Sequence, residues 1–213
     1  MKFSNLGFYK KDDKVIEGFI GDYVTSLDKV KIAFILREPN SSGEAADKFW
    51  FKEIVEHNKD DNPYFSKLGE IACLLLKENN KQEALKNGIY INLNPEKGEK
   101  SASQEYRKIY IAFENKDCQN TIAKSRWEII NSLPQGCKIV TVGDIFNAIK
   151  SNVKPNSETI QGLAITSSTI DRCFEAFSFN NAQGNIEVYS IYHPQSYGKN
   201  HYNGYEIKLN SKE

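Results

Sequence analysis

The chain has 213 residues, of which 39% are hydrophobic and 26% are charged, and its basic and acidic residues balance to a formal net charge of zero. This composition is ordinary for a soluble globular protein, and because a neutral chain can still carry a local basic patch, a DNA partner is neither indicated nor excluded. No apolar run reaches about 18 residues, so we predict no membrane-spanning helix and no membrane partner. The polar N-terminus, MKFSNLGFYKKDD, lacks a signal-peptide core, so we expect a cytoplasmic protein.

Four short apolar segments, rich in β-branched residues, predict buried strands. In chain order they are KIAFIL (31–36), GIYINL (88–93), KIVTV (138–142) and IEVYSIY (186–192). Continuous apolar runs, rather than alternating ones, are typical of parallel strands that are covered on both faces.

Helical patterns lie between these strands. In chain order they are NPYFSKLGEIACLLLKEN (62–79), SASQEYRKIYIAFEN (101–115), NTIAKSRWEIINSLP (120–134) and GDIFNAIKSN (143–152). The polar stretch 153–170 is predicted to be a loop with short structure. The alternation predicts an α/β fold, a three-layer sandwich with a central, mostly parallel four-stranded sheet flanked by helices. The length and the absence of a linker favour one domain over residues 1–213, and we expect a monomer.

The cysteines are widely spaced and form no C-x-x-C pair. They are Cys73, Cys118, Cys137 and Cys173. Zinc and iron–sulfur sites use closely spaced thiolates, so we expect no metal and instead buried, reduced thiols.

Polar, turn-forming sequences follow each predicted strand. They are REPNSSG (37–43), NPEKGEKSAS (94–103), GD (143–144) and HPQSYGK (193–199). In open α/β sheets, ligands bind beyond the carboxyl ends of the strands, at the point where the strand order reverses. These four exits therefore form the candidate site.

The order of the exit motifs resembles that of the uracil-DNA glycosylase superfamily. LREPN (36–40) stands where the family has a G-x-x-P turn, and IYIN (89–92) ends a second strand with asparagine. TVG (141–143) is a third strand exit, and HPQS (193–196) corresponds to a late H-P-S motif. The resemblance covers most of the chain, from about Lys31 to Tyr202. It implies a uracil-DNA glycosylase-like fold, DNA as the partner, and cleavage of an N-glycosidic bond without a cofactor.

The resemblance assigns catalytic roles to Glu38 and His193. A carboxylate at Glu38 would polarise water and stabilise the cationic sugar that forms as the bond breaks. The family's histidine donates a hydrogen bond to uracil O2, where negative charge collects as the base leaves. From the residues alone, Glu38 is equally readable as a solvated turn acid or a partner of Arg37, and His193 as a capping or packing residue.

Base binding is assigned to Asn92, Phe51 and Pro39. An amide at Asn92 offers both a donor and an acceptor to the edge of uracil, with Asn94 as the competing candidate. Phe51 lies fifteen residues after Leu36, a spacing similar to that of the family's stacking phenylalanine. A flipped base needs such a flat apolar surface, although FWF (49–51) also reads as a core cluster.

DNA contacts are assigned to four residues of two exit loops. Ser196 and Lys199 would hold phosphates, Tyr197 would wedge into the duplex, and Ser101 belongs to a second polar, partly basic loop. Tyr197 also reads as an ordinary exposed loop aromatic, and lysine runs are usually solvated surface.

The sequence departs from the family pattern at three positions. Leu36 stands in place of the glycine that lets the backbone approach the base, Glu38 is longer than aspartate, and Gln195 replaces the serine of H-P-S. A base-excision glycosylase for a deaminated base, uracil first, is the leading hypothesis. The alternatives are a module of the same fold that binds DNA, a base, a nucleotide or a protein without turnover, and an unrelated α/β hydrolase-like or nucleotide-processing enzyme. The last is weakened because the chain has neither a G-x-S-x-G elbow nor a phosphate-binding P-loop.

Overall fold

The computed structural model describes residues 2–4, 6–11, 14–15, 17–20, 25–37, 63–95, 103–166, 171–191 and 206–210. Its helices are the 3-10 helix η1 (Leu27–Lys29), α2 (Pro63–Leu76), α3 (Lys81–Lys86), α4 (Gln104–Glu114), α5 (Thr121–Ser132) and α6 (Gly143–Asn152). Its strands are β1 (Lys2–Phe3), β2 (Tyr9–Lys11), β3 (Lys14–Val15), β4 (Gly18–Phe19), β5 (Ile32–Leu36), β6 (Gly88–Asn92), β7 (Lys138–Val142), β8 (Leu163–Thr166), β9 (Asp171–Cys173), β10 (Ala176–Asn181), β11 (Gly184–Ile191) and β12 (Glu206–Leu209).

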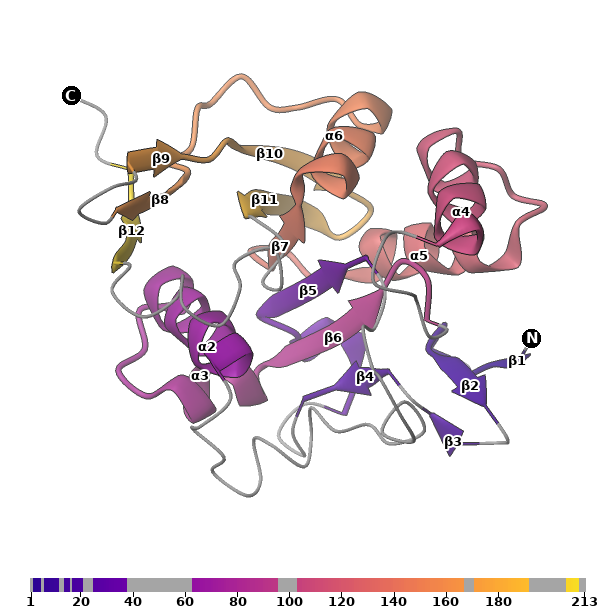
Figure 1. The fold of residues 1–213 in the computed structure, drawn as a ribbon, viewed down its shortest axis with the longest axis horizontal. Helices are drawn as coiled ribbons and strands as arrows, with labels where there is room; N and C mark the ends of the chain where they lie inside the picture. The colour runs from indigo at the N-terminus through magenta and orange to yellow at the C-terminus, as the bar shows by residue number, and fades with distance from the viewer. Residues whose placement is uncertain are drawn as a thin grey trace.

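A mixed six-stranded sheet forms the centre of the molecule, in the order β10-β11-β7-β5-β6-β4 (Figure 1). The four predicted strands correspond to β5, β6, β7 and β11, and these pair in parallel with one another. The edge strands β4 and β10 are antiparallel to β6 and β11. The prediction of a four-stranded, mostly parallel sheet is therefore wrong. The sheet has six strands, and it is mixed because both edge strands pair antiparallel.

The two edge strands carried weak sequence signals. β4 is only two residues long, Gly18–Phe19, which is too short for an apolar pattern. β10 ends in Asn180 and Asn181, which are depleted in strands, and it forms a hairpin with β11. The Asn181 side chain accepts hydrogen bonds from the backbone N–H groups of Gln183 (2.8 Å) and Gly184 (3.0 Å), which fixes the turn.

Side-chain caps help to fix where two of the helices begin. Ser103 caps α4 by accepting a hydrogen bond from the Tyr106 N–H at 3.0 Å. Asn120 caps α5 in the same way, through the N–H groups of Ile122 (3.1 Å) and Ala123 (3.0 Å). The helical predictions over α2, α4, α5 and α6 are confirmed, whereas α3, with six residues, was not predicted.

The helices pack on the sheet in two groups. α2 packs with α3, whereas α4 packs with both α5 and α6, and Figure 1 shows the groups on either side of the central strands. The β5–β6 connection runs one way across the sheet, and the connections from β6 to β7 and from β7 to β11 run the other way, so the general right-handedness of such connections favours α2 and α3 on one face and α4, α5 and α6 on the other. This is compatible with a three-layer α/β arrangement. None of the described helices has the length and apolarity to cross a bilayer.

Two small three-stranded sheets lie beside the central one. β1, β2 and β3 form the first, and β12, β8 and β9 form the second. β8 accounts for the short structure expected within residues 153–170. Apolar side chains from the central strands and from α2 to α6 make one buried cluster, in which Phe34, Ile91 and Val140 are fully buried.

The cysteines are only partly as expected. All four thiols are free, and only Cys137 is buried, where burial raises its pKa. Cys118 and Cys173 are exposed and Cys73 is half-buried, so the prediction of buried thiols is wrong at these three positions. Cys118 lies in the connection between α4 and α5, and Cys173 ends the short strand β9.

Candidate functional site

The point where the strand order reverses lies between β5 and β7. From β5 the chain moves to β6 on one side, and it then crosses to β7 on the other side. The connections that follow β5 and β7 run in opposite directions, and in open α/β sheets ligands bind beyond the carboxyl ends of the strands at such a point. Arg37 directly follows β5, and Gly143 and Asp144 directly follow β7. These three residues therefore define the candidate site.

An ion pair joins the two strand ends. The Nε of Arg37 donates to both carboxylate oxygens of Asp144, at 3.2 and 3.0 Å. The hydroxyl of Tyr106, in the first turn of α4, donates to Asp144 Oδ2 at 2.7 Å. Three elements that are far apart in the sequence thus meet on one carboxylate. We call Arg37, Asp144 and Tyr106 the switch-point cluster.

The cluster is partly open to solvent. The side chains of Arg37 and Asp144 are 39% and 25% exposed, whereas Tyr106 is buried. Burial of the Tyr106 phenol, and then the negative charge of Asp144, raises its pKa well above the ordinary value. Burial disfavours the charged guanidinium of Arg37, but the carboxylate of Asp144 outweighs this, so the pKa of Arg37 is raised.

This geometry suits Asp144 to positioning rather than to proton transfer. Its carboxylate already accepts bonds from a guanidinium and a phenol, and Oδ1 also accepts from the Ile145 N–H at 3.0 Å. A general base needs a lone pair that is directed at its substrate. What Asp144 does is fix the position of Arg37, the residue that leads from β5 into Glu38.

The start of α6 leaves its backbone accessible. A Cβ built at Gly143 would meet no atom within 4 Å, so open space lies beside this residue. Val142, the N-cap, makes no side-chain capping hydrogen bond. Gly143 thus lies at the strand-to-helix turn that the resemblance suggested, and nothing in its surroundings demands glycine on steric grounds.

The end of β6 presents two buried amides. Asn92 is 5% exposed and Asn94 is 1% exposed. Asn92 Oδ1 accepts a long hydrogen bond, 3.4 Å, from the hydroxyl of Tyr90. The backbone N–H of Asn94 donates to Arg37 O at 2.8 Å, which ties this strand end to the switch-point cluster. Asn92 lies opposite Leu36 in the β5–β6 register, so the structure places it at the carboxyl edge, as expected.

A second ion pair supports the same strand end from the other side. Glu17 is 3% exposed and accepts two bonds from Arg126 Nη2, both at 2.9 Å. Its Oε1 also accepts from the backbone N–H of Asn92 at 2.9 Å, and its Oε2 accepts from the N–H of Tyr9 at 3.1 Å. Arg126 is fully buried, and its Nε and Nη1 have no hydrogen-bond partner in the described part of the chain.

Most of the predicted site residues lie outside the described residues. They are Glu38, Pro39, Phe51, Ser101, His193, Ser196, Tyr197 and Lys199. Among the predicted site residues, the structure therefore describes Asn92, and it also describes the competing Asn94. It further shows that Leu36, which stands where the family has glycine, is fully buried at the end of β5.

The structure adds residues that the sequence did not single out for a site. Arg37 and Asp144 carried a signal, because each directly follows a predicted strand and their charges are opposite. Tyr106 and Glu17 carried none, since their partners are 38 and 75 residues away in the chain. Only the folded topology brings these groups to the carboxyl edge.

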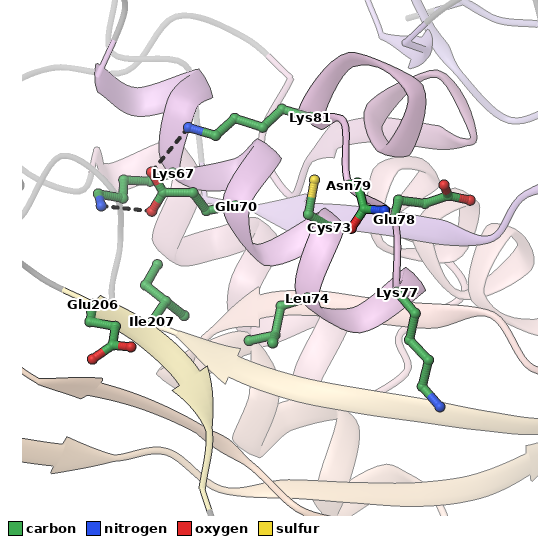
Figure 2. Close-up of a pocket in the computed structure, with 10 residues that line it drawn as sticks. All are labelled: Lys67, Glu70, Cys73, Leu74, Lys77, Glu78, Asn79, Lys81, Glu206 and Ile207. Atoms are coloured by element: carbon green, nitrogen blue, oxygen red, sulfur yellow. Dashed lines mark hydrogen bonds and ion pairs between the residues drawn. The ribbon is translucent and has the colours of Figure 1, made fainter.

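A separate hollow lies between α2 and β12 (Figure 2). It has a volume of about 820 Å³ and is lined by Lys67, Glu70, Cys73, Leu74, Lys77, Glu78, Asn79, Lys81, Glu206 and Ile207. Glu70 accepts from both Lys67 (2.7 Å) and Lys81 (3.1 Å), and Figure 2 shows this bridge at one end of the hollow. Its three lysines and three glutamates balance, so it attracts neither sign of charge, and strand ends of the central sheet do not line it.

No group of three or more metal-ligating side chains occurs within the described ranges. Comparison with known proteins finds no family model and no curated protein that matches this chain. The function is therefore argued from the site and from the sequence motifs that surround it.

Proposed function

We propose that this chain is a monofunctional DNA glycosylase, which hydrolyses the N-glycosidic bond of a flipped, deaminated base, uracil first. The proposal is supported above all by strand order. The four strands that lead into the motifs at residues 36–40, 92, 143 and 193–196 are neighbours in the sheet and run in parallel. Their carboxyl ends therefore share one edge, and the order reverses between the strands that carry the first and third motifs.

Glu38 and His193 carry the chemistry in this proposal. Glu38 activates water and stabilises the oxocarbenium-like sugar, and His193 stabilises the departing base by a hydrogen bond to its O2. Each role requires a side chain near the strand ends: Glu38 follows Arg37 directly, and His193 follows the last residue of β11 by two positions. No metal or organic cofactor is needed.

Asn92 reads the base. A side-chain amide supplies the donor and acceptor pair that uracil's O4 and N3–H require. Its burial at 5% exposure gives those hydrogen bonds a low-dielectric setting, and its single described side-chain bond, to Tyr90, is long. Phe51 and Pro39 supply the apolar contact surface for the flipped base, and Ser101, Ser196, Tyr197 and Lys199 contact the DNA.

The switch-point cluster has a supporting role in the same scheme. The Asp144 carboxylate, in the first turn of α6, binds the Arg37 side chain and is itself held by Tyr106 of α4, so the chain enters Glu38 from a fixed Arg37. A misplacement of about 1 Å at a reacting group costs on the order of 100-fold in rate, so this support matters for catalysis.

The test is release of uracil from an end-labelled oligonucleotide, single-stranded and double-stranded, scored as strand scission at the abasic sites. Wild type is compared with Glu38→Ala and His193→Ala, each expected to lose about 100-fold in rate or more. His57→Ala and Glu105→Ala are matched controls, of which Glu105 lies on the outer face of α4. Asn92→Ala is expected to lose binding of the base, with Asn94→Ala distinguishing the two amides.

Equal scission by wild type and by both catalytic variants would point to a contaminating enzyme and would contradict the assignment. Absence of scission on uracil and on other deaminated bases would favour the second candidate, a module that binds DNA or a base without turnover. Leu36 favours that candidate, because its buried side chain occupies the position at which the family has glycine.

A further inference from the structure

Arg37 is fixed both at its backbone and at its side chain. Its carbonyl oxygen accepts a hydrogen bond from the Asn94 N–H at 2.8 Å. Its Nε donates to both carboxylate oxygens of Asp144, at 3.2 and 3.0 Å. The Tyr106 hydroxyl and the Ile145 N–H hold that carboxylate in turn, at 2.7 and 3.0 Å. The guanidinium of Arg37 therefore has a defined position before any ligand binds.

The ion pair uses only part of this guanidinium. A guanidinium donates hydrogen bonds from Nε and from two Nη nitrogens. Neither Nη nitrogen of Arg37 forms a hydrogen bond with a described residue, and the side chain is 39% exposed. Asp144 is also the only described carboxylate that raises the pKa of Arg37, so no second acid in this part of the chain competes for the Nη donors. The side chain can therefore bind an acceptor from outside the protein.

Arg37 lies where the topology favours a ligand. It directly follows β5, at the point where the strand order reverses. Space beside the ion pair is open, because a Cβ built at Gly143, the neighbour of Asp144, would meet no described atom within 4 Å. Asn92, the proposed base-reading residue, ends the adjacent strand β6 opposite Leu36. A ligand on Arg37 would therefore share one sheet edge with the proposed base.

The residue type favours a phosphate as this ligand. Arginine accounts for four of the 28 basic residues in the chain, so a lysine-rich sequence carries arginine at this strand end. A planar guanidinium can bind two oxygens of one phosphate in a fixed geometry, whereas an ammonium acts as a point charge. Because Asp144 already balances the charge of Arg37, binding would depend on the direction of these hydrogen bonds more than on net charge.

We propose that Arg37 binds a DNA phosphate next to the flipped nucleotide through its Nη nitrogens, while Asp144 holds it at Nε. The proposal rests on the proposed function for its choice of DNA. It gives Arg37 a direct contact with the substrate, in addition to its place before Glu38. This contact is separate from those that the motif resemblance assigned, at Ser101, Ser196, Tyr197 and Lys199.

The test removes the phosphate charge and the arginine separately and together. Fluorescence anisotropy measures the affinity of the full chain for a labelled oligonucleotide with one uracil, whose sugar carries a 2′-fluoro group that suppresses cleavage by destabilising the cationic sugar. In matched oligonucleotides, a neutral methylphosphonate replaces the phosphate on the 5′ side or on the 3′ side of this nucleotide. The proteins are wild type, Arg37→Gln, Arg37→Lys and the control Lys150→Gln. Lys150 is 44% exposed and paired with Glu175, but it lies in the last turn of α6, whereas Asp144 lies in the first.

Wild type is expected to bind one of the two methylphosphonate oligonucleotides at least about 10-fold more weakly than the unmodified one, because a hydrogen bond between charged groups is lost. Arg37→Gln should bind the unmodified oligonucleotide about 10-fold more weakly than wild type, and it should not distinguish it from that methylphosphonate. Arg37→Lys should recover only part of the affinity, because it keeps the charge but loses the planar fork. Lys150→Gln should stay within about twofold of wild type.

Circular dichroism and urea denaturation establish that the variants are folded. If Arg37→Gln does not fold, Arg37→Lys carries the same prediction with a smaller loss of affinity, since it keeps a positive charge beside Asp144.

Each outcome separates this proposal from the proposed function. Release of uracil from a cleavable oligonucleotide, with equal sensitivity of wild type and Arg37→Gln to the methylphosphonates, would overturn the phosphate contact and leave the glycosylase standing. Coupling between Arg37 and one phosphate, without uracil release, would support the contact and remove the glycosylase. Wild type that binds none of the oligonucleotides would overturn both. Arg37-dependent binding of deoxyuridine monophosphate but not deoxyuridine, without coupling on the oligonucleotides, would overturn the DNA contact in favour of a free nucleotide.

Discussion

Two ion pairs flank the carboxyl edge, and they differ in how far water reaches them. Glu17–Arg126 is almost completely buried, with side-chain exposures of 2% and 0%. Arg37–Asp144 is 39% and 25% exposed. Both pairs hold backbone at the ends of central strands, the first through the Asn92 N–H and the second through Arg37 itself.

The difference in exposure implies different roles for the two ion pairs. A buried ion pair carries a desolvation penalty, and removing one partner leaves an uncompensated charge in the core. Arg126 increases that penalty, because two of its nitrogens lack a hydrogen-bond partner among the described residues. A half-exposed pair is screened by water, so it contributes less to stability and can rearrange around a ligand. We therefore expect the buried pair to control folding and the switch-point cluster to control activity.

The largest predicted effect is on the buried pair. Glu17→Leu should destabilise the protein by about 3 to 5 kcal/mol, because Arg126 is left charged and unpaired in the core. The measurement is the free energy of unfolding from urea denaturation. The comparison holds where wild type and variant give the same m-value, the slope of that free energy against urea concentration. Uracil release per folded molecule should fall as well, since the Asn92 N–H loses its acceptor.

The double variant Glu17→Leu/Arg126→Met is the control for this effect. Replacing both charges by apolar groups of similar size is often neutral or better, so part of the loss should be recovered. Recovery should stay incomplete, because the N–H groups of Tyr9 and Asn92 still lack their acceptor. A single variant as stable as wild type would contradict the comparison between the two pairs.

A smaller effect is predicted for the switch-point cluster. Asp144→Ala should cost about 1 to 2 kcal/mol in the free energy of unfolding, since it removes the acceptor of the buried Tyr106 hydroxyl and a half-screened ion pair. Uracil release should fall by more than stability accounts for, on the order of 100-fold, because Arg37 loses its anchor. Stability comes from urea denaturation, and rate from single-turnover strand scission under folded conditions.

The exposed pair Glu105–Lys108 on α4 provides the reference for that measurement. Its side chains are 49% and 70% exposed and its charged atoms lie 3.4 Å apart, so Glu105→Gln should change stability by less than about 0.5 kcal/mol. It should leave the rate unchanged. If Asp144→Ala behaves like Glu105→Gln in both assays, the switch-point cluster is an ordinary surface ion pair.

The sequence predicted what depends on local pattern. The four parallel strands and the four longer helices were found because their apolar patterns lie within the elements themselves. The edge strands were missed, because β4 is too short for a pattern and β10 depends on its hairpin partner. At the site, strand ends such as Asn92 and Asp144 could be located from chain order. The bonds of Glu17 and Tyr106 could not be foreseen, because they join segments that only the tertiary fold brings together.

The smallest predicted effect is a dependence on pH, because the switch-point cluster includes the phenol of Tyr106, a titratable group. Burial and the charge of Asp144 raise the pKa of Tyr106 above its ordinary value of 10. Its contribution to stability is therefore complete below pH 10 and is lost as the pH rises further, since only the unfolded state then ionises. The stability advantage of wild type over Tyr106→Phe, from urea denaturation between pH 8 and 11, should stay constant to about pH 10 and shrink above it. Tyr110, whose pKa burial and Glu114 raise to about 12, is the matched control, and extending the series to pH 12 should show its loss beginning near pH 10 and ending near pH 12. An advantage that stays constant or grows above pH 10 would mean that the phenol of Tyr106 ionises in the folded protein as readily as in the unfolded protein. The cluster would then be more open to water than its geometry indicates.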